Sequence, residues 1–380
     1  MQHYVIKTSI DPTSSVDRPS NVLIHVPRTA GTYFHNCLTA NGVSAVDHLE
    51  RFLGPPGDAR SEGCLSKITG QNPLWVSGHM RYGTLVKHFP VEQGNRFFIL
   101  LRNPFDQLIS QINWQINTLC GSYAALAYMP NYQFRTLLRI CIETVDHQDN
   151  LLNILNRYFG NFLNNQSRSL SLLDKGRLDP SEINDFSDRA FQRLSGLDGF
   201  CVEPGLAGFL EDLISWSKED ETTPVSVQGV SQNASLPVLN PTLVSSAAFM
   251  NEVFRLQFAD FVVYRNAQHL LGGGSSALAW DSFNSLLADC SGILREARSI
   301  ERQPDSRLFS KARRRITCLI WLARAGDLIT RKISLRWLIC LLELLPSATL
   351  RNLLRGRRSI FWKTASLVFV AKIRTQIRLS

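Results

Sequence analysis

Short apolar runs that stop at a proline, a glycine or a charged residue recur along much of the chain. The first occupies residues 22–26 and stops at Pro27, and the second occupies residues 97–101. These runs are rich in β-branched or aromatic residues and are too short for a buried helix, which favours strands of a parallel sheet. Shorter runs at 74–76 and 199–202 predict further strands.

The segments between these runs carry apolar residues at helical spacing. We expect helices at residues 33–38, 82–88 and 205–216 and mainly helical structure over 105–158, whereas the polar segment 161–188 is expected to be a loop. Strands that alternate with helices are typical of a sheet of parallel strands covered by helices. The pattern therefore predicts an α/β fold with a parallel sheet.

The turn after the first predicted strand has an unusual composition. Arg28 supplies a cation, Thr29 and Thr32 supply hydroxyls, and Ala30 and Gly31 allow a ligand to come close. A helix N-terminus leaves backbone N–H groups unpaired and carries a partial positive charge, so this turn can hold an anion. It lacks the early glycine and the lysine–hydroxyl pair of the nucleotide-triphosphate signature. An anion site and an ordinary strand–helix connection are equal alternatives on these residues alone.

A second cation follows the second long apolar run. Arg102 comes directly after residues 97–101, Pro104 opens the next helix, and Ser110 lies two helical turns later. Ligands of open α/β sheets bind outside the carboxyl ends of the strands, so Arg28 and Arg102 are expected to face one crevice. Two arginines there imply a ligand with two anionic groups.

Three segments resemble motifs of the sulfotransferases that use 3'-phosphoadenosine-5'-phosphosulfate (PAPS). HVPRTAGT at 25–32 is similar to their 5'-phosphosulfate loop, RNPFDQLIS at 102–110 to their 3'-phosphate motif, and SGHMRYG at 77–83 to a segment of the carbohydrate and bacterial branch. The family usually has Lys at the position of Arg28 and Gly at that of Ala30. The resemblance is specific over residues 21–114 and looser as far as 265.

This resemblance implies a P-loop-like fold and a role for each motif residue. The residues that would hold the 5'-phosphosulfate are Arg28, Thr29, Ala30, Gly31, Thr32 and Tyr33. Arg102 and Ser110 would hold the 3'-phosphate. His79 would be the catalytic base, and Arg28 would also stabilise charge on the bridging oxygen. Residues with lesser expected roles are Arg81 and Lys87, as acceptor contacts, and His25, as a core or supporting residue.

Each of these residues also has an ordinary alternative. His79 can be a structural histidine, and Arg28 can be a solvated surface arginine. Arg102 can form a salt bridge with Asp106 one helical turn further on, and Ser110 can be a hydroxyl on the helix face. The position of the histidine at a strand end, within a match of three ordered motifs, favours the catalytic role for His79.

Charge divides the chain into an acidic and a basic part. Residues 301–380 contain 18 Lys and Arg against 4 Asp and Glu, whereas residues 1–300 contain 23 against 28. The segment GGGSS at 272–276 is typical of a flexible hinge. The predicted organisation is an N-terminal tail at 1–20, a sulfotransferase domain at 21–271 and a basic helical C-terminal region at 272–380.

The basic region has two equal interpretations. Apolar runs with tryptophans alternate with Lys and Arg over 316–345, and no charge-free run reaches the roughly 18 residues expected of a membrane-spanning helix. A basic amphipathic helix can bind an anionic membrane surface, here through residues 301–380. Alternatively, the helices pack on the catalytic domain or on another subunit. No nucleic-acid-binding motif accompanies the charge, so no nucleic-acid partner is expected.

Composition supports a globular protein with reduced thiols. The 380 residues are 44% hydrophobic and 19% charged, enough for one α/β domain with an appendage. None of the eight cysteines forms a CxxC pair, and residues 1–20 show no export signal. We expect a cytoplasmic protein, placed at the inner face of the membrane if the basic region binds lipid.

Together these features predict transfer of a sulfuryl group from PAPS to a hydroxyl of a glycan or glycolipid acceptor. No acidic cluster lies near the turn, so no metal is expected and a magnesium-dependent kinase is disfavoured. The alternative from another class is a non-catalytic, anion-binding or membrane-associated scaffold of the same fold. In that case Arg28 and Ala30, which depart from the family pattern, would reflect a loss of catalytic activity.

Overall fold

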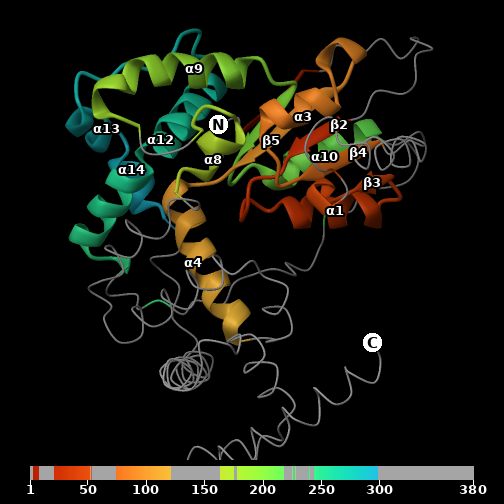
Figure 1. Cartoon of the computed structure of the whole chain (residues 1–380), viewed down its shortest axis with the longest axis horizontal. Helices are drawn as coiled ribbons and strands as arrows, with labels where there is room; N and C mark the ends of the chain where they lie inside the picture. Colours follow the sequence, from red (N-terminus) through yellow and green to blue (C-terminus); the bar gives the residue numbers. More distant parts are fainter. Residues whose placement is uncertain are drawn as a thin grey trace, which may run out of the picture. The chain divides into compact units, whose positions relative to one another are not determined.

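The computed structural model describes residues 3–7, 21–51, 53, 74–120, 163–174, 178–217, 225, 227, 239 and 244–297 (Figure 1). The chain divides into two compact units, one made of residues 1–112 and 155–303 and the other of residues 113–154 and 304–380. All the described residues except 113–120 belong to the first unit. Predictions for 137–155 and for the basic residues 301–380 lie outside the described residues.

The sheet is mixed and has six strands in the order β1-β6-β5-β2-β4-β3. The strands are β1 Tyr4–Ile6, β2 Asn21–Ile24, β3 Ala45–Val46, β4 Trp75–Gly78, β5 Arg96–Leu101 and β6 Gly199–Val202. β2 to β6 run parallel to their neighbours, whereas β1 pairs antiparallel with β6. The α/β class and the strands predicted near residues 22–26, 74–76, 97–101 and 199–202 are confirmed.

The prediction that the whole sheet is parallel was wrong at one edge. Residues of the predicted N-terminal tail form β1, in which Tyr4 pairs with Cys201 of β6. The Tyr4 ring also packs edge-on against Phe209 at 5.7 Å between centroids, and its hydroxyl donates to Asp212 at 2.6 Å. A triplet this short gives no period in the sequence, so its pairing is set by these tertiary contacts.

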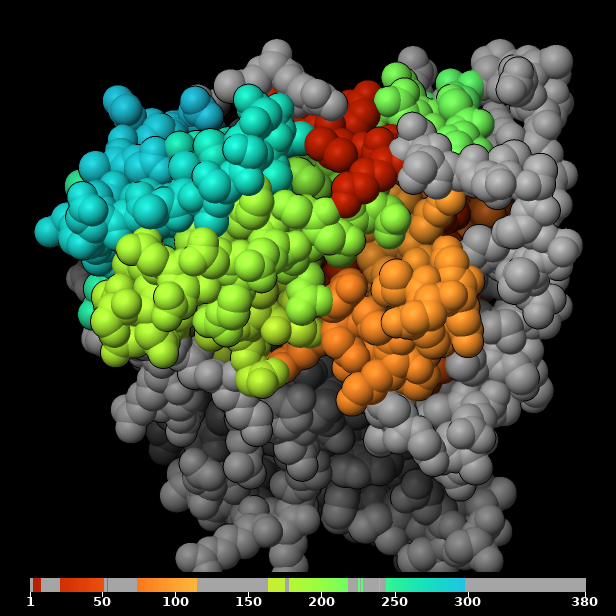
Figure 2. Space-filling view, turned by 90° about the horizontal axis from the view of Figure 1, so that it is seen from above, coloured from red at the N-terminus to blue at the C-terminus, as the bar shows by residue number. Residues whose placement is uncertain are grey.

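Helices cover both faces of the sheet. They are α1 Gly31–Ala40, η1 Leu49–Arg51, α3 Tyr82–His88, η2 Val91–Gln93, α4 Pro104–Cys120, α8 Asn165–Ser169, η4 Pro180–Glu182, α9 Ile183–Ser195, α10 Leu206–Ser217, α12 Ala247–Leu271, α13 Phe283–Asp289 and α14 Ser291–Arg295. α9 packs along α12, and Figure 2 shows the lime surface of α9 beside the teal surface of α12. Among the described residues, no helix is long and apolar enough to cross a membrane.

The prediction of a loop over 161–188 was wrong in part, because α8 lies inside this segment and α9 begins at Ile183. The N-terminus of α8 is held by the buried Asp260 of α12, which accepts hydrogen bonds from Gln166 N at 3.1 Å and from Ser167 N at 2.7 Å. Burial raises the pKa of Asp260 to about 6, against the opposite pull of these hydrogen bonds. Such a long-range cap leaves no local trace in a polar sequence.

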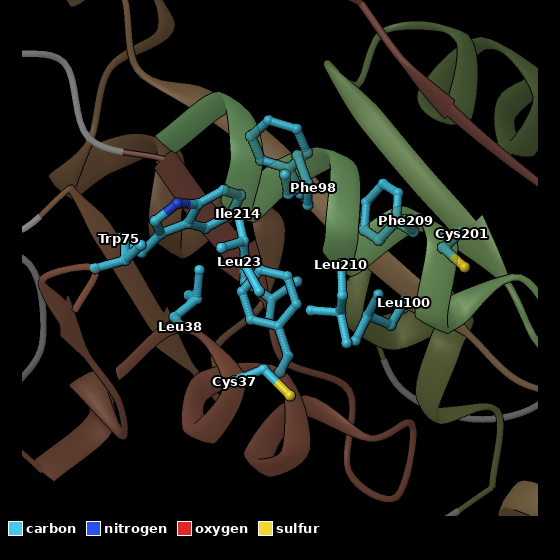
Figure 3. Close-up of a cluster of buried hydrophobic side chains, with 13 residues drawn as sticks. Leu23, Cys37, Leu38, Trp75, Phe98, Leu100, Cys201, Phe209, Leu210 and Ile214 are labelled. Carbon is cyan, nitrogen blue, oxygen red and sulfur yellow. The ribbon is translucent and has the colours of Figure 1, made fainter. Parts of the chain in front are cut away.

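α1 and α10 enclose a hydrophobic core against one face of the sheet (Figure 3). Trp75 of β4 belongs to this core, with ring centroids 5.0 Å from Phe34 of α1 and 4.9 Å from Phe98 of β5. The described thiols Cys37, Cys201 and Cys290 are buried and free, as the sequence predicts for them. This core fixes α1, and with it the turn that precedes α1, to the end of β2.

The first unit continues beyond the glycine-rich segment at 272–276, so the predicted boundary at 271/272 falls inside it. Arg265 of α12 forms an ion pair with Asp289 of α13 at 2.7 Å, and the buried Trp280 donates from Nε1 to the same carboxylate at 3.3 Å. These contacts attach α13 to α12. The assignment of 21–271 as a sulfotransferase domain stays a prediction.

Candidate anion-binding and catalytic site

The turn from β2 to α1 has a backbone suited to binding an anion. Arg28 and Ala30 take left-handed conformations, with φ of 69° and 70°, which cost a non-glycine residue roughly 1–2 kcal/mol each. The buried Thr29 closes the turn by donating from Oγ1 to Val26 O at 2.9 Å. No side chain caps the N-terminus of α1, where Gly31 is the first residue. The polar backbone of this turn therefore precedes a helix N-terminus without a side-chain cap.

Arg28, Ser110 and Arg102 lie together at the carboxyl ends of the adjacent strands β2 and β5. Arg28 Nε donates to Ser110 Oγ at 3.2 Å, and Arg102 Nη1 donates to Arg28 O at 3.1 Å. Arg102 Nε also forms an ion pair with Glu203 Oε2 at 3.1 Å. Glu203, which follows β6, is thus a carboxylate partner of Arg102 that the sequence did not indicate.

The guanidinium groups of Arg28 and Arg102 lie near enough to affect each other's charge. Burial lowers the pKa of Arg28 to about 10, and the charge of Arg102 acts in the same direction. Arg28 still carries its charge at neutral pH. Because like charges are held close together in a partly desolvated place, a ligand with two negative groups would be favoured there.

Gln166 holds the backbone of Arg102 from both sides. Its Oε1 accepts from Arg102 N at 3.0 Å and its Nε2 donates to Arg102 O at 2.9 Å. The Gln166 side chain is fully buried on α8, whose N-terminus Asp260 holds. The sequence gives no signal for this role, since Gln166 stands in a polar segment far along the chain.

His79 follows β4 and is held by two backbone contacts. Its Nδ1 lies 2.9 Å from His25 O, and its N–H donates to Glu50 Oε2 at 2.9 Å. A carbonyl oxygen only accepts, so Nδ1 carries the proton and Nε2 keeps its lone pair. Surrounding protein atoms desolvate the ring and lower the pKa of His79 to about 4, with repulsion from His25 in the same direction, although the residue keeps a solvent-exposed face.

His25 connects His79 with the turn. The two rings lie 4.1 Å apart between centroids, and a Cβ added to Gly31 would come within 2.1 Å of the His25 ring. His25 is buried, and its Nδ1 lies 3.4 Å from Asp47 Oδ1. The expectation of a core or supporting residue is confirmed for its position, and the glycine at 31 is explained by the ring that packs on it.

Replacement of Gly31 by alanine is expected to destabilise the protein by about 1–3 kcal/mol, the usual cost of forcing an extra methyl group into a packed site. The new Cβ would collide with the His25 ring and push it away from the turn. Urea unfolding measures the change. Gly292→Ala is the matched control, since nothing lies within 4 Å of its Cβ position. Equal stability of both variants would show that the turn does not depend on this contact.

The sequence motifs did not single out a carboxylate and histidine group beside His79. Asp47, His48 and Glu50 follow β3, and Asp47 Oδ1 accepts from Ser77 Oγ at 2.5 Å, while His48 Nδ1 lies 2.8 Å from Glu50 Oε1. Burial would raise the pKa of Asp47, but hydrogen bonds from His25 and Ser77 hold it well below its ordinary value. Three titratable residues within four positions after a short strand are the signal that could have revealed this group.

The remaining predicted residues lie around this centre with other contacts. Arg81 donates to Asp174 Oδ1 at 3.0 Å and to Asp174 O at 2.9 Å, and Lys87 is exposed in the last turn of α3. Thr32 and Tyr33 lie in the first turn of α1, and the Tyr33 hydroxyl donates to Val227 O. None of these contacts involves His79.

Comparison of the chain with protein-family models, curated proteins and solved structures gives no match. The described residues show an α/β protein with two arginines and a histidine cluster near the ends of its parallel strands.

Proposed function

We propose that the chain transfers a sulfuryl group from PAPS to a hydroxyl of a glycan or glycolipid acceptor. The observation that supports this proposal is the contact of Arg28 with both Ser110 and Arg102 at the ends of two adjacent parallel strands. A nucleotide with anionic groups on both the 3' and the 5' oxygen of one ribose would be bound by two cations of this kind. The histidine beside the turn adds the proton acceptor that an alcohol nucleophile requires.

The roles of the residues follow from the chemistry of the transfer. The acceptor oxygen forms a bond to sulfur while the bond from sulfur to the 5'-phosphate oxygen breaks, and the acceptor proton passes to His79 Nε2. Arg28 stabilises the charge that develops on the leaving oxygen. Arg102 binds the 3'-phosphate, for which its contact with Glu203 has to be exchanged for the ligand.

Desulfated cofactor, 3'-phosphoadenosine-5'-phosphate, is expected to bind the full-length protein with micromolar affinity, about −8 kcal/mol. ATP with magnesium should bind far more weakly, because it has no 3'-phosphate to replace Glu203 as the partner of Arg102. Isothermal titration of both ligands measures the difference. Preference for ATP would replace the sulfotransferase proposal by a nucleotide-triphosphate enzyme, and binding of neither would remove the cofactor assignment.

One observation favours a second function, a non-catalytic anion-binding or membrane-associated scaffold. Glu203 already neutralises Arg102, and the left-handed position at 30 holds an alanine. A scaffold would bind the desulfated cofactor or another dianion without any transfer of sulfate. Transfer from radiolabelled PAPS to a mixture of glycans and glycolipids separates the two functions.

A cytoplasmic location and contact of residues 301–380 with an anionic membrane belong to the same proposal. Those residues lie outside the described part of the chain. A vesicle sedimentation assay with full-length protein, at low salt and with anionic lipid, addresses the membrane contact directly.

A further inference from the structure

We propose that His48, Glu50 and His79 form a binding site for a divalent transition-metal ion, with Zn²⁺ as the best fit. One candidate ligand atom from each residue lies within 4.8 Å of the other two. Two imidazoles and one carboxylate are a donor set that Zn²⁺ takes, and three protein ligands leave a fourth position for water or a ligand. A pattern of acidic residues does not reveal this triad, because two of its three donors are imidazoles.

The polar atoms that would not touch the metal are already engaged. His79 Nδ1 is bonded to His25 O, and Glu50 Oε2 accepts from His79 N, so His79 Nε2 and Glu50 Oε1 remain for a metal. Metal-binding histidines generally donate their second ring nitrogen to a carboxylate or a carbonyl, as His79 does, which fixes the ring orientation. His48 is the exception, because its Nε2 lies 3.6 Å from Asp47 Oδ2, beyond hydrogen-bond distance, while its Nδ1 faces Glu50 Oε1 at 2.8 Å.

The spacing of the donors suits a small ion. His48 Nδ1 and Glu50 Oε1 are 2.8 Å apart, whereas neighbouring donors around tetrahedral zinc, at about 2.0–2.1 Å from the metal, are roughly 3.3 Å apart. The ion would therefore replace one hydrogen bond and draw in the third donor by about an ångström or more. About a third of each side chain of His48 and Glu50 is exposed, 30% and 32%, so an ion can reach them from solvent.

Two supporting features belong to the architecture around the triad. Gly78 permits the close approach of η1, since a Cβ there would lie 2.9 Å from Glu50 Oε2. Asp47 is fixed by Ser77 of β4 and faces His48 from the other side. The ligands thus come from a loop, a short helix and a strand end that are packed on one another, which favours a preformed site.

Metal binding would compete with the proposed transfer, because both use His79 Nε2. A bound ion should therefore inhibit sulfate transfer, and a chelator should restore it. The metal site itself does not depend on the proposed function, since it is tested without PAPS or acceptor.

The test is titration of chelator-treated, full-length protein with Co²⁺ and Zn²⁺. Co²⁺ in a four-coordinate site gives strong visible absorption, and Zn²⁺ should displace it at a ratio of one ion to one chain. His48→Ala, Glu50→Gln and His79→Ala should each weaken Zn²⁺ binding by at least about tenfold, and Asp47→Asn by about tenfold or more as a supporting residue. His269→Ala is the matched control, since it removes an imidazole from the last turn of α12.

Circular dichroism of each variant shows whether it is folded, and Glu50→Gln keeps the shape of the side chain if an alanine variant fails to fold. Unchanged Zn²⁺ affinity in folded His48, Glu50 and His79 variants would overturn the proposal, as would an equal loss in His269→Ala or the absence of binding at millimolar Zn²⁺. Binding of Zn²⁺ by these residues without binding of the desulfated cofactor would leave the metal site in place and refute the sulfotransferase. Binding of the desulfated cofactor without binding of Zn²⁺ would refute the metal site and leave the proposed function in place.

Discussion

Replacement of His79 by alanine is expected to lower the turnover number of sulfate transfer by about 10² to 10⁴, the usual contribution of a positioned base. Affinity for the desulfated cofactor should be nearly unchanged, because the proton that His79 takes belongs to the acceptor. The physical basis is the fixed tautomer: the hydrogen bond from Nδ1 to His25 O leaves the lone pair on Nε2. Initial rates with saturating acceptor, in chelator-treated protein, measure the effect without interference from bound metal.

Lys87→Ala is a suitable comparison at saturating acceptor, since Lys87 is exposed on the neighbouring helix α3 and is expected to contact the acceptor without taking its proton. It should retain native turnover. Native turnover in His79→Ala would exclude His79 as the base and direct attention to Glu50 and His48, which lie beside it. A large loss of cofactor affinity in the same variant would mean that the imidazole supports the turn through His25.

Elements with a continuous apolar run were predictable from the sequence because burial on both faces leaves a plain local pattern. β6 and α3 have the predicted bounds, and β5 begins one residue earlier. β1 and α8 were missed because each is short and is held by a distant partner, Phe209 and Asp260 respectively. Their stability comes from tertiary contacts, which no periodicity within the segment can reveal.

The same distinction between local patterns and distant contacts separates the site residues that were predicted from those that were not. Arg28 and Arg102 were found because each follows a recognisable strand, and parallel strands bring their carboxyl ends to one edge. Gln166 and Glu203 were missed because each reaches the site from far along the chain, as in the bonds from Gln166 to the backbone of Arg102. The cations of the crevice could therefore be predicted, whereas the groups that orient and neutralise them could not.

Replacement of Arg102 by alanine is expected to weaken binding of the desulfated cofactor by about 1.5–3 kcal/mol, the usual value of a hydrogen bond to a charged group, or roughly 10- to 150-fold. Adenosine 5'-phosphosulfate, which lacks the 3'-phosphate, should lose much less affinity. The reason is that the two cations have different partners: Arg28 contacts Ser110 beside the turn, whereas Arg102 lies between Arg28 O and Glu203 at the end of β5. Isothermal titration of both ligands to both proteins gives the difference.

Arg96→Ala is the matched control for this comparison, because Arg96 stands at the opposite end of the same strand and stacks on Trp216 at 5.0 Å. This variant also removes one positive charge, but from the other end of the strand, and should leave the affinities for both ligands unchanged. Equal losses for both ligands in Arg102→Ala would mean that Arg102 acts only by supporting the backbone of Arg28 through its bond to Arg28 O. In that case the 3'-phosphate would have to be bound elsewhere, and the second cation of the crevice would serve to shape the turn.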